Sequence, residues 1–180
     1  MIDCTKIKNY NNFKIISGVI SDTQIEELLD FWNQKKIGTI TNVNNWDTNS
    51  EMKTKIDADN RVVEIVGIKK SFIPFLTEIL FNCFECVTDS FELEGPHYFT
   101  YYPLGGKHSK HKDFIKSFNR EWVITLMLND NFEGGDLIIE GEIVPKEKGC
   151  VIIYNGNTKH EVTPVTKGQR FVITECAGKI

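Results

Sequence analysis

The second half of the chain contains a succession of short runs rich in β-branched and aromatic residues. Turn-forming residues of the types Gly, Asn, Asp and Pro bound these runs. The runs cover residues 97–102, 122–128, 137–144, 151–154 and 170–176. This pattern predicts a series of short strands. Many short strands that follow a helical first part predict an antiparallel sandwich, for which a double-sheet jelly roll is the natural form.

The first part of the chain has the periodicity of helices. Ser21 and Gln24 have the spacing of a capping box, and apolar residues follow at helical spacing as far as Trp32. A second helix is predicted over 71–87, with Pro74 in its first turn, where a missing N–H does no harm. We therefore expect an α+β fold, a double-stranded β-helix (jelly roll) with N-terminal helices packed on one sheet.

We expect one domain over 1–180, because this length suits one hydrophobic core and is short for two. Residues 1–95 would supply helical support, and 96–180 would form the jelly-roll catalytic core. Within the first part, 35–60 is polar and rich in Asn, Thr, Asp and Lys. A loop of this length is typical of a functional lid, and a mobile surface loop fits the same composition. Trp46, in its middle, would cover a substrate or anchor the loop by packing.

Composition is that of an ordinary globular protein. Hydrophobic residues make up 41% of the chain and the formal charge is −4, so the strong positive charge common in nucleic-acid-binding domains is absent. The N-terminus has no signal-peptide pattern, and no apolar run approaches the roughly 18 residues that a membrane span needs. We therefore expect a cytoplasmic protein, with neither a membrane nor a nucleic acid as its partner.

The five cysteines are an odd number and mostly scattered, which does not suggest a disulfide framework. Cys83 and Cys86 form a C-x-x-C inside an apolar stretch, with no second pair to complete a zinc site. We interpret them as two thiols of a buried helix, and we expect a reducing intracellular setting.

His111 and Asp113 form a His-x-Asp sequence at the end of a strand-like stretch. Their side chains should point the same way, because residues of a strand alternate with period two. Two imidazoles and one carboxylate are the ligands that hold non-haem Fe(II) on one face. His160, in another strand-like stretch, can provide the second imidazole. Arg170 opens the last run, and its planar guanidinium suits the far carboxylate of a dicarboxylate that chelates the metal.

Over 99–174 the order and spacing of these motifs resemble the prolyl 4-hydroxylase-like branch of the 2-oxoglutarate/Fe(II) dioxygenase superfamily. The matching stretches are 102–106, 111–113, 120–129, 132–137, 149–154 and 160–170. The resemblance implies that His111, Asp113 and His160 bind the iron. It also implies that Arg170 binds the far carboxylate of 2-oxoglutarate.

The resemblance implies further residues of the site. Tyr102 matches a tyrosine that lines the co-substrate pocket, and Thr174 matches a small polar position near that pocket. Arg61 resembles an arginine often found at this place, with a role at the substrate or the lid. His108 is either a solvated loop histidine or a substrate contact, and Trp46 is a candidate substrate contact from the polar loop.

Two positions depart from the family pattern without touching the metal ligands. Met127 stands where some relatives have a tyrosine that contacts the co-substrate, and Cys176 stands where an aromatic residue is common. The resemblance implies hydroxylation of a prolyl residue in a protein or peptide, with Fe(II), 2-oxoglutarate and O₂, release of succinate and CO₂, and ascorbate as a stimulant. Asp113 argues against a halogenase, whose iron needs that ligand position for halide.

Other activities are compatible with the same core. The substrate could be another side chain or a free amino acid. A nucleic-acid demethylase is less favoured, because such enzymes usually carry a second arginine soon after the one that binds the co-substrate, and only Lys179 is basic beyond Arg170. A non-catalytic sensor would bind metal and 2-oxoglutarate and consume no oxygen.

Overall fold

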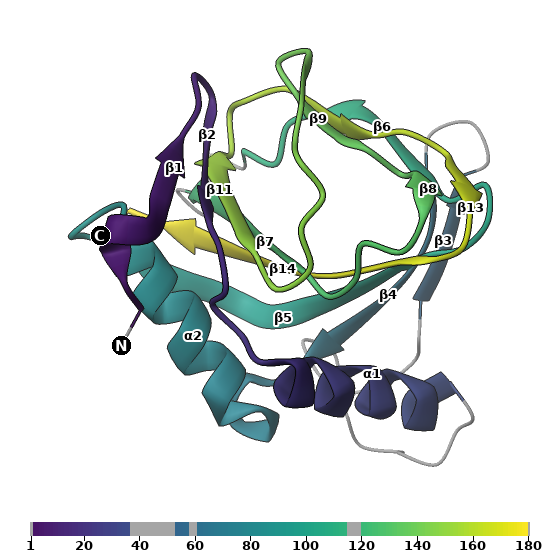
Figure 1. Ribbon diagram of the computed structural model, residues 1–180, viewed down its shortest axis with the longest axis horizontal. Coiled ribbons are helices and arrows are strands. Elements are labelled where there is room, and N and C mark those ends of the chain that lie inside the picture. The colour runs from purple at the N-terminus through teal and green to yellow at the C-terminus, as the bar shows by residue number, and fades with distance from the viewer. Residues whose placement is uncertain (1, 37–52, 58–60, 115–119, 180) are drawn as a thin grey trace.

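The computed structural model describes residues 2–36, 53–57, 61–114 and 120–179 (Figure 1). In this part of the chain, one antiparallel sheet of twelve strands has the order β1-β2-β11-β7-β14-β5-β4-β6-β12-β9-β10, with β3 beside β4. The strands β8 and β13 form a separate pair. The long sheet curls so that β6 and β9 lie across the roll from β7 and β14 (Figure 1). The predicted α+β jelly roll is confirmed.

The strands are short, as the runs in the sequence indicated. In chain order they are β1 Ile7–Asn9, β2 Phe13–Ile16, β3 Lys53–Asp57, β4 Arg61–Ile68, β5 Glu92–Tyr102, β6 Lys107–His111, β7 Arg120–Met127, β8 Glu133–Gly134, β9 Leu137–Ile139, β10 Glu142–Ile143, β11 Val151–Asn155, β12 His160–Val162, β13 Val165–Lys167 and β14 Arg170–Gly178. The strands β5, β7 and β14 are the longest of the central ones, and β14 pairs with both of the others.

Two α-helices, α1 (Asp22–Lys36) and α2 (Pro74–Glu85), lie on one side of the sheet (Figure 1). The capping box is present: Gln24 N donates to Ser21 Oγ at 3.2 Å, and Ser21 N donates to Gln24 Oε1 at 3.1 Å. The second helix is shorter than the predicted 71–87. It begins at Pro74 after the 3₁₀ turn η2 (Lys70–Phe72), and another 3₁₀ turn, η1 (Cys4–Lys6), lies near the N-terminus.

Two hydrophobic clusters lie on opposite faces of the main sheet. The helix-facing cluster includes Leu28, Trp32, Leu76, Leu80, Phe84, Phe99 and Ile173, and the cluster inside the roll includes Val63, Tyr102, Met127, Ile139, Val162 and Val172. Alternation along β14 therefore sends Ile173 toward the helices and Val172 into the roll. Arg170 and Thr174 have the parity of Val172, so they belong to the inner face.

The polar stretch 35–60 contains more regular structure than its composition suggested. Its first two residues belong to α1, and Lys53–Asp57 forms β3, which pairs with Arg61–Ile65 of β4. The expectation of one long loop over 35–60 is wrong to this extent. The remainder, including Trp46, lies outside the described residues, so the lid stays a prediction.

The cysteines also differ from the expectation. Cys4 and Cys86 form a disulfide, whereas Cys83, Cys150 and Cys176 are free and buried. Cys83 is a buried helical thiol as interpreted, but Cys86 is not a free thiol. The two bonded residues are 82 positions apart, and spacing alone carries no signal for a pairing at such a distance. None of the described helices has the length and apolar character to cross a membrane.

Candidate metal centre

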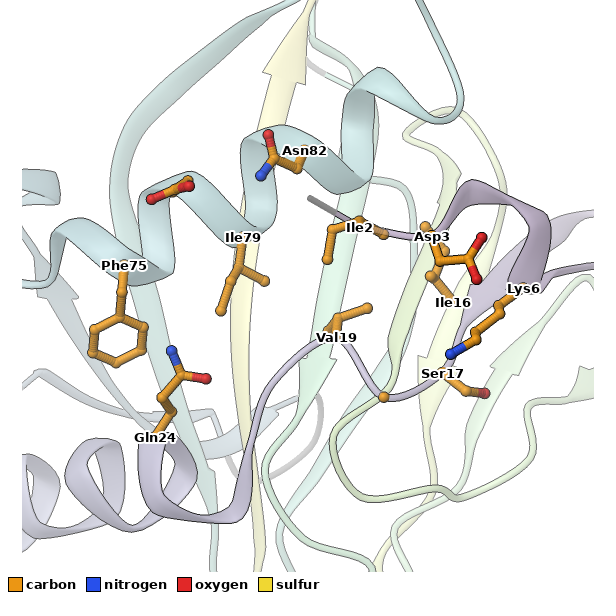
Figure 2. Close-up of a pocket in the computed structure, with 12 residues that line it drawn as sticks. Ile2, Asp3, Lys6, Ile16, Ser17, Val19, Gln24, Phe75, Ile79 and Asn82 are labelled. Carbon is orange, nitrogen blue, oxygen red and sulfur yellow. The ribbon is translucent and has the colours of Figure 1, made fainter.

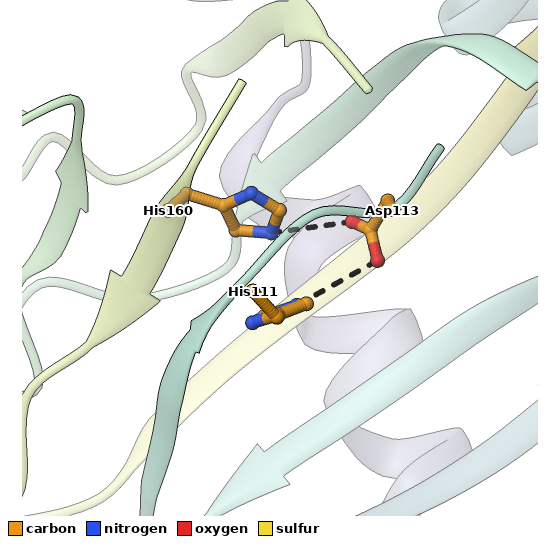
Figure 3. A group of neighbouring side chains, drawn as sticks. All are labelled: His111, Asp113 and His160. Carbon is orange, nitrogen blue, oxygen red and sulfur yellow. Dashed lines mark ion pairs between the residues drawn. The ribbon is translucent and has the colours of Figure 1, made fainter. Parts of the chain in front are cut away.

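The side chains of His111, Asp113 and His160 point toward one another (Figure 3). His111 ends β6, and its cross-strand partner in β12 is His160. Asp113 lies just beyond β6, where its backbone N–H donates to the Gly156 carbonyl at 3.0 Å. His160 Nε2 is 3.2 Å from Asp113 Oδ2, and His111 Nε2 is 3.6 Å from Oδ1. The three ligand atoms all lie within 4.8 Å of one another. The three predicted metal ligands are thus brought together.

Hydrogen bonds to the backbone orient both rings. His111 Nδ1 lies 2.7 Å from the Ser109 carbonyl oxygen, and His160 Nδ1 lies 3.1 Å from the Thr158 carbonyl oxygen. A carbonyl only accepts, so each Nδ1 carries a proton and donates. Each Nε2 then faces Asp113 and is the ring nitrogen that a metal can bind. Two imidazole nitrogens and a carboxylate form a donor set that suits Fe(II).

The Asp113 carboxyl is held in its ionised form. Burial by itself would raise its pKa, but hydrogen bonds from His111 and His160 and the charge of their rings outweigh burial. The pKa therefore lies below its ordinary value. An anionic oxygen ligand is thus available to a metal across the physiological pH range.

Arg170 is a buried cation inside the roll, with 1% of its surface exposed. Its guanidinium carbon lies 4.6 Å from the centre of the Tyr102 ring, and Nη2 is 3.9 Å from Met127 Sδ. Its Nε and Nη1 are buried and have no hydrogen-bond partner among the described residues. Burial lowers the pKa of Arg170, yet a guanidinium remains charged in proteins. A buried cation is costly unless it is paired, and Arg170 forms no ion pair within the described ranges, so this side chain is arranged for an anionic ligand.

The sequence profile of the 2OG-Fe(II) oxygenase superfamily matches residues 97–176, a segment that contains all three metal ligands and Arg170. The chain is also similar to two PKHD-type hydroxylases. It is 33% identical to the one from Teredinibacter turnerae over 88 residues, which are 42% of this chain and 39% of that protein. It is 42% identical to the one from Nitrobacter winogradskyi over 52 residues, which are 26% of this chain and 23% of that protein.

Several solved structures share the fold of the chain. A prolyl-4-hydroxylase from Pseudomonas putida superposes with a TM-score of 0.69 at 16% identity, covering 94% of this chain and 93% of that chain. The viral collagen prolyl hydroxylase from Paramecium Bursaria Chlorella virus-1 gives 0.71 at 14% identity, with 94% and 97% covered. A prolyl hydroxylase from Trichoplax adhaerens gives 0.70 at 19% identity, with 95% and 85% covered. The fold of the chain is that of these prolyl hydroxylases.

The matched family model implies Fe(II), 2-oxoglutarate and O₂, and the residues of the chain fit the first two. The Nε2 atoms of His111 and His160 converge with the Asp113 carboxylate, which suits the metal. Two nitrogens of the buried Arg170 guanidinium have no partner among the described residues, and a carboxylate of 2-oxoglutarate would supply one. Tyr102 is opposite Arg170 in the pairing of β5 with β14 and lies under its guanidinium, and its role in a co-substrate pocket stays a prediction.

The remaining predicted site residues are placed less directly. Thr174 is on the inner face of β14, two residues beyond Val172, and its contact with the co-substrate stays a prediction. Arg61 begins β4 and is paired with His108 of β6. His108 is a strand residue whose ring lies 3.7 Å from that of His111, so the interpretation as a solvated loop histidine is wrong.

Two residues of the site escaped the sequence analysis. Tyr154 of β11 is buried and meets the His160 ring edge-on at 4.8 Å between ring centres. Burial raises the pKa of Tyr154 well above its ordinary value, and the hydroxyl is hydrogen-bonded to Thr125. The signal for both was their position on strands β7 and β11, whose inner faces line the roll. Met127, noted in the sequence as a departure from the family pattern, contacts Arg170 through sulfur.

The structure shows why position 135 is occupied by glycine. Its φ of +60° favours glycine, and a Cβ there would lie 2.9 Å from Val165 Cγ2 and 3.3 Å from Arg170 Cδ. The turn before β9 can therefore pass close to the stem of Arg170 only with glycine at this position. Sequence reasoning recognised the glycine as a turn residue and missed its contact with the arginine.

Proposed function

We propose that the protein is an Fe(II)- and 2-oxoglutarate-dependent dioxygenase that hydroxylates a prolyl residue of a protein or peptide and releases succinate and CO₂. The observation that carries the proposal is the pairing of a three-ligand metal centre with a buried, uncompensated arginine in one roll. Either feature alone has other uses. Together they match the two ends of a chelating dicarboxylate.

The residues have separate tasks in this reaction. His111, Asp113 and His160 would hold the iron, which when bound supplies the activation of O₂ and couples the decarboxylation of 2-oxoglutarate to hydroxylation. Arg170 would bind the far carboxylate through its free N–H groups. The Tyr102 ring, packed against the guanidinium, restricts the directions in which those groups can point.

The walls of the roll keep water away from the co-substrate. Met127, Val172 and Tyr102 are all buried and belong to one cluster with the strands around Arg170. A dry pocket strengthens the ion pair between Arg170 and a carboxylate, because the effective dielectric constant is low there. The same dryness makes binding of a neutral analogue unfavourable, since the guanidinium would stay unpaired.

The prolyl substrate is supported by the kinds of protein that share the fold. The neighbours from Pseudomonas putida and the Chlorella virus are prolyl hydroxylases, and the one from Trichoplax adhaerens is in complex with a peptide fragment of hypoxia inducible factor. The segments matched in the two PKHD-type hydroxylases are 39% and 23% of their length. We therefore assign a protein or peptide substrate as part of the proposal.

The test is succinate formation from 2-oxoglutarate in air with Fe(II) and ascorbate, with and without prolyl peptides. Asp113→Ala should abolish turnover, whereas Asp89→Ala, at an exposed position outside the site, should not change it. A hydroxylated peptide must gain one oxygen atom in mass, and its alanine counterpart must not. A wild-type protein that binds metal and 2-oxoglutarate tightly but consumes no oxygen with any peptide would instead be a sensor.

A further inference from the structure

An irregularity in the pairing of β6 with β12 places a second histidine inside the roll. His160 is opposite His111, and Val162 is opposite His108, so two steps along β12 correspond to three along β6. The extra residue is a β-bulge. Without it, alternation would put His108 and His111 on opposite faces. With it, both rings are on the inner face that His160 and Val162 share.

The ring of His108 packs directly on the ring of the metal ligand. The two ring centres are 3.7 Å apart and the planes are inclined by 31°. Within the described ranges, no hydrogen bond to this ring is found, so its contact with His111 is one of packing.

Each of the two ligand histidines packs against a neighbouring ring. The ring of His160 is 5% exposed and is packed edge-on against Tyr154. The ring of His111 is 25% exposed, and the rings of His108 and His160 pack against it at 3.7 and 4.2 Å between ring centres. A ring free to rotate about its χ2 angle would turn Nε2 away from Asp113. A flat neighbour restricts that rotation.

We propose that His108 is a positioning residue that holds the His111 ring with Nε2 toward the metal. This inference rests on the proposed metal site and goes beyond it, because His108 would act on a ligand and not on the substrate. The role needs a flat ring and does not need a ring nitrogen. Another aromatic residue at position 108 should therefore hold the His111 ring equally well.

The test measures Co(II) binding by calorimetry and by the visible spectrum of the bound ion, with no turnover required. His108→Ala should weaken binding by about two- to tenfold, the range for one ring–ring contact, and should alter the spectrum. His108→Phe should restore both, and Lys110→Ala, an exposed change in the same bulge, should alter neither. Unchanged binding in His108→Ala, or failure of His108→Phe to restore it, refutes the positioning role. A wild-type protein that binds no Co(II) refutes the metal site itself.

A separate observation concerns the N-terminal segment, residues 2–9. Its turn η1 has no buried residue, and β1 is bound to the sheet only through β2. The disulfide between Cys4 and Cys86 ties the segment to the end of α2. A cavity of about 360 Å³ lies between them, with Ile2 on one side and Ile79 on the other (Figure 2). None of its lining residues belongs to the metal centre.

From this arrangement we infer that the disulfide is a redox latch, which keeps the segment against α2 and the cavity closed on that side. A dithiol reductant would open it: the disulfide takes up two electrons and two protons to give two thiols, and the dithiol becomes a disulfide. Cys4 is exposed and can be reached. Cys83, one helical turn before Cys86, is buried, and burial raises its pKa to about 12, so it is not a competing nucleophile.

Hydrogen exchange followed by mass spectrometry tests the latch. Dithiothreitol should speed amide exchange in residues 2–9 at least tenfold and leave β5 unchanged. Cys4→Ser should exchange fast with or without the reductant. If Cys4 and Cys86 both react with iodoacetamide in the protein as purified in air, or if the reductant changes nothing in residues 2–9, there is no latch.

Discussion

We predict that replacing the buried Glu175 with Gln makes the free energy of unfolding nearly independent of pH between 6.5 and 9. The carboxyl lies on the helix-facing side of β14, is 0% exposed and is hydrogen-bonded to Nδ1 of His97. The other ring nitrogen of His97 is 2.8 Å from Thr77 Oγ1 of α2. Burial raises the pKa of Glu175 to about 9, and burial together with the charge of Lys70 lowers that of His97 to about 4.

The two shifts act on stability in opposite directions. The raised pKa of Glu175 contributes to the stability of the folded protein. This contribution is complete below pH 4.5, the ordinary pKa of the group, and is lost as the pH rises toward 9. The lowered pKa of His97 gives a contribution that is complete above 6.5 and is lost as the pH falls toward 4. Between pH 4.5 and 6.5, the two contributions change the free energy of unfolding with opposite slopes against pH and offset each other. Above pH 6.5, of these two slopes only the one due to Glu175 remains.

The expected change in the free energy of unfolding follows from the width of the range between pH 6.5 and 9. One pH unit corresponds to about 1.4 kcal/mol for one proton, so 2.5 units (9 − 6.5) give at most about 3.5 kcal/mol. Lys70 Nζ, 3.9 Å from the carboxyl, favours the ionised form and reduces the slope. We expect wild-type protein to lose about 1 to 3 kcal/mol between pH 6.5 and 9.

Urea denaturation at several pH values measures this directly. Glu175→Gln keeps the shape and a hydrogen bond to His97 but does not titrate, so its curve should be flat above pH 6.5. Glu85→Gln, at an exposed position of α2, is the matched control and should follow the wild type. Equal slopes for wild type and Glu175→Gln would show that the buried carboxyl keeps no proton in this range.

Three further changes test the site and the core. Arg170→Lys should raise the KM for 2-oxoglutarate by roughly ten- to a hundredfold, because an ammonium cannot make two parallel bonds to a carboxylate; an unchanged KM in the succinate assay would remove Arg170 from the co-substrate pocket. Gly135→Ala should weaken 2-oxoglutarate binding through the stem of Arg170 while leaving Co(II) affinity unchanged, and a loss of both would indicate general misfolding. Leu28→Ala, at a side chain with 0% exposure under the sheet, should lower the unfolding free energy by about 2–5 kcal/mol in urea titrations, and a loss below 1 kcal/mol would mean that the site repacks.

The metal ligands and Arg170 could be found from the sequence because their chemistry limits the choice of residue. Few side chains bind Fe(II) or a buried carboxylate, and the glycines and short runs around them mark strand ends. The fold followed for a related reason, since alternation along strands such as β14 and helical spacing around Leu28 are local patterns. Such patterns survive in a single sequence without knowledge of the partners.

Other features depend on partners that a single sequence does not reveal. The strand β3 is a polar run, and it is a strand because β4 pairs with it. The inward turn of His108 requires the bulge, which is a mismatch between β6 and β12 and has no residue signature of its own. The bond between Cys4 and Cys86 joins positions that are close only after folding.

The carbonyl groups that accept from His111 and His160 have a consequence for how the centre is loaded. Each belongs to the residue two positions earlier in the same segment of chain, so the tautomer is encoded locally and needs no distant acidic residue. Both imidazoles are poised as soon as β6 and β12 pair. Uptake of the ion should then need little rearrangement of the chain, and its speed should be governed by diffusion and by loss of water from the ion. A chelator could strip and a fresh ion refill such a centre repeatedly, with the surrounding strands unaltered.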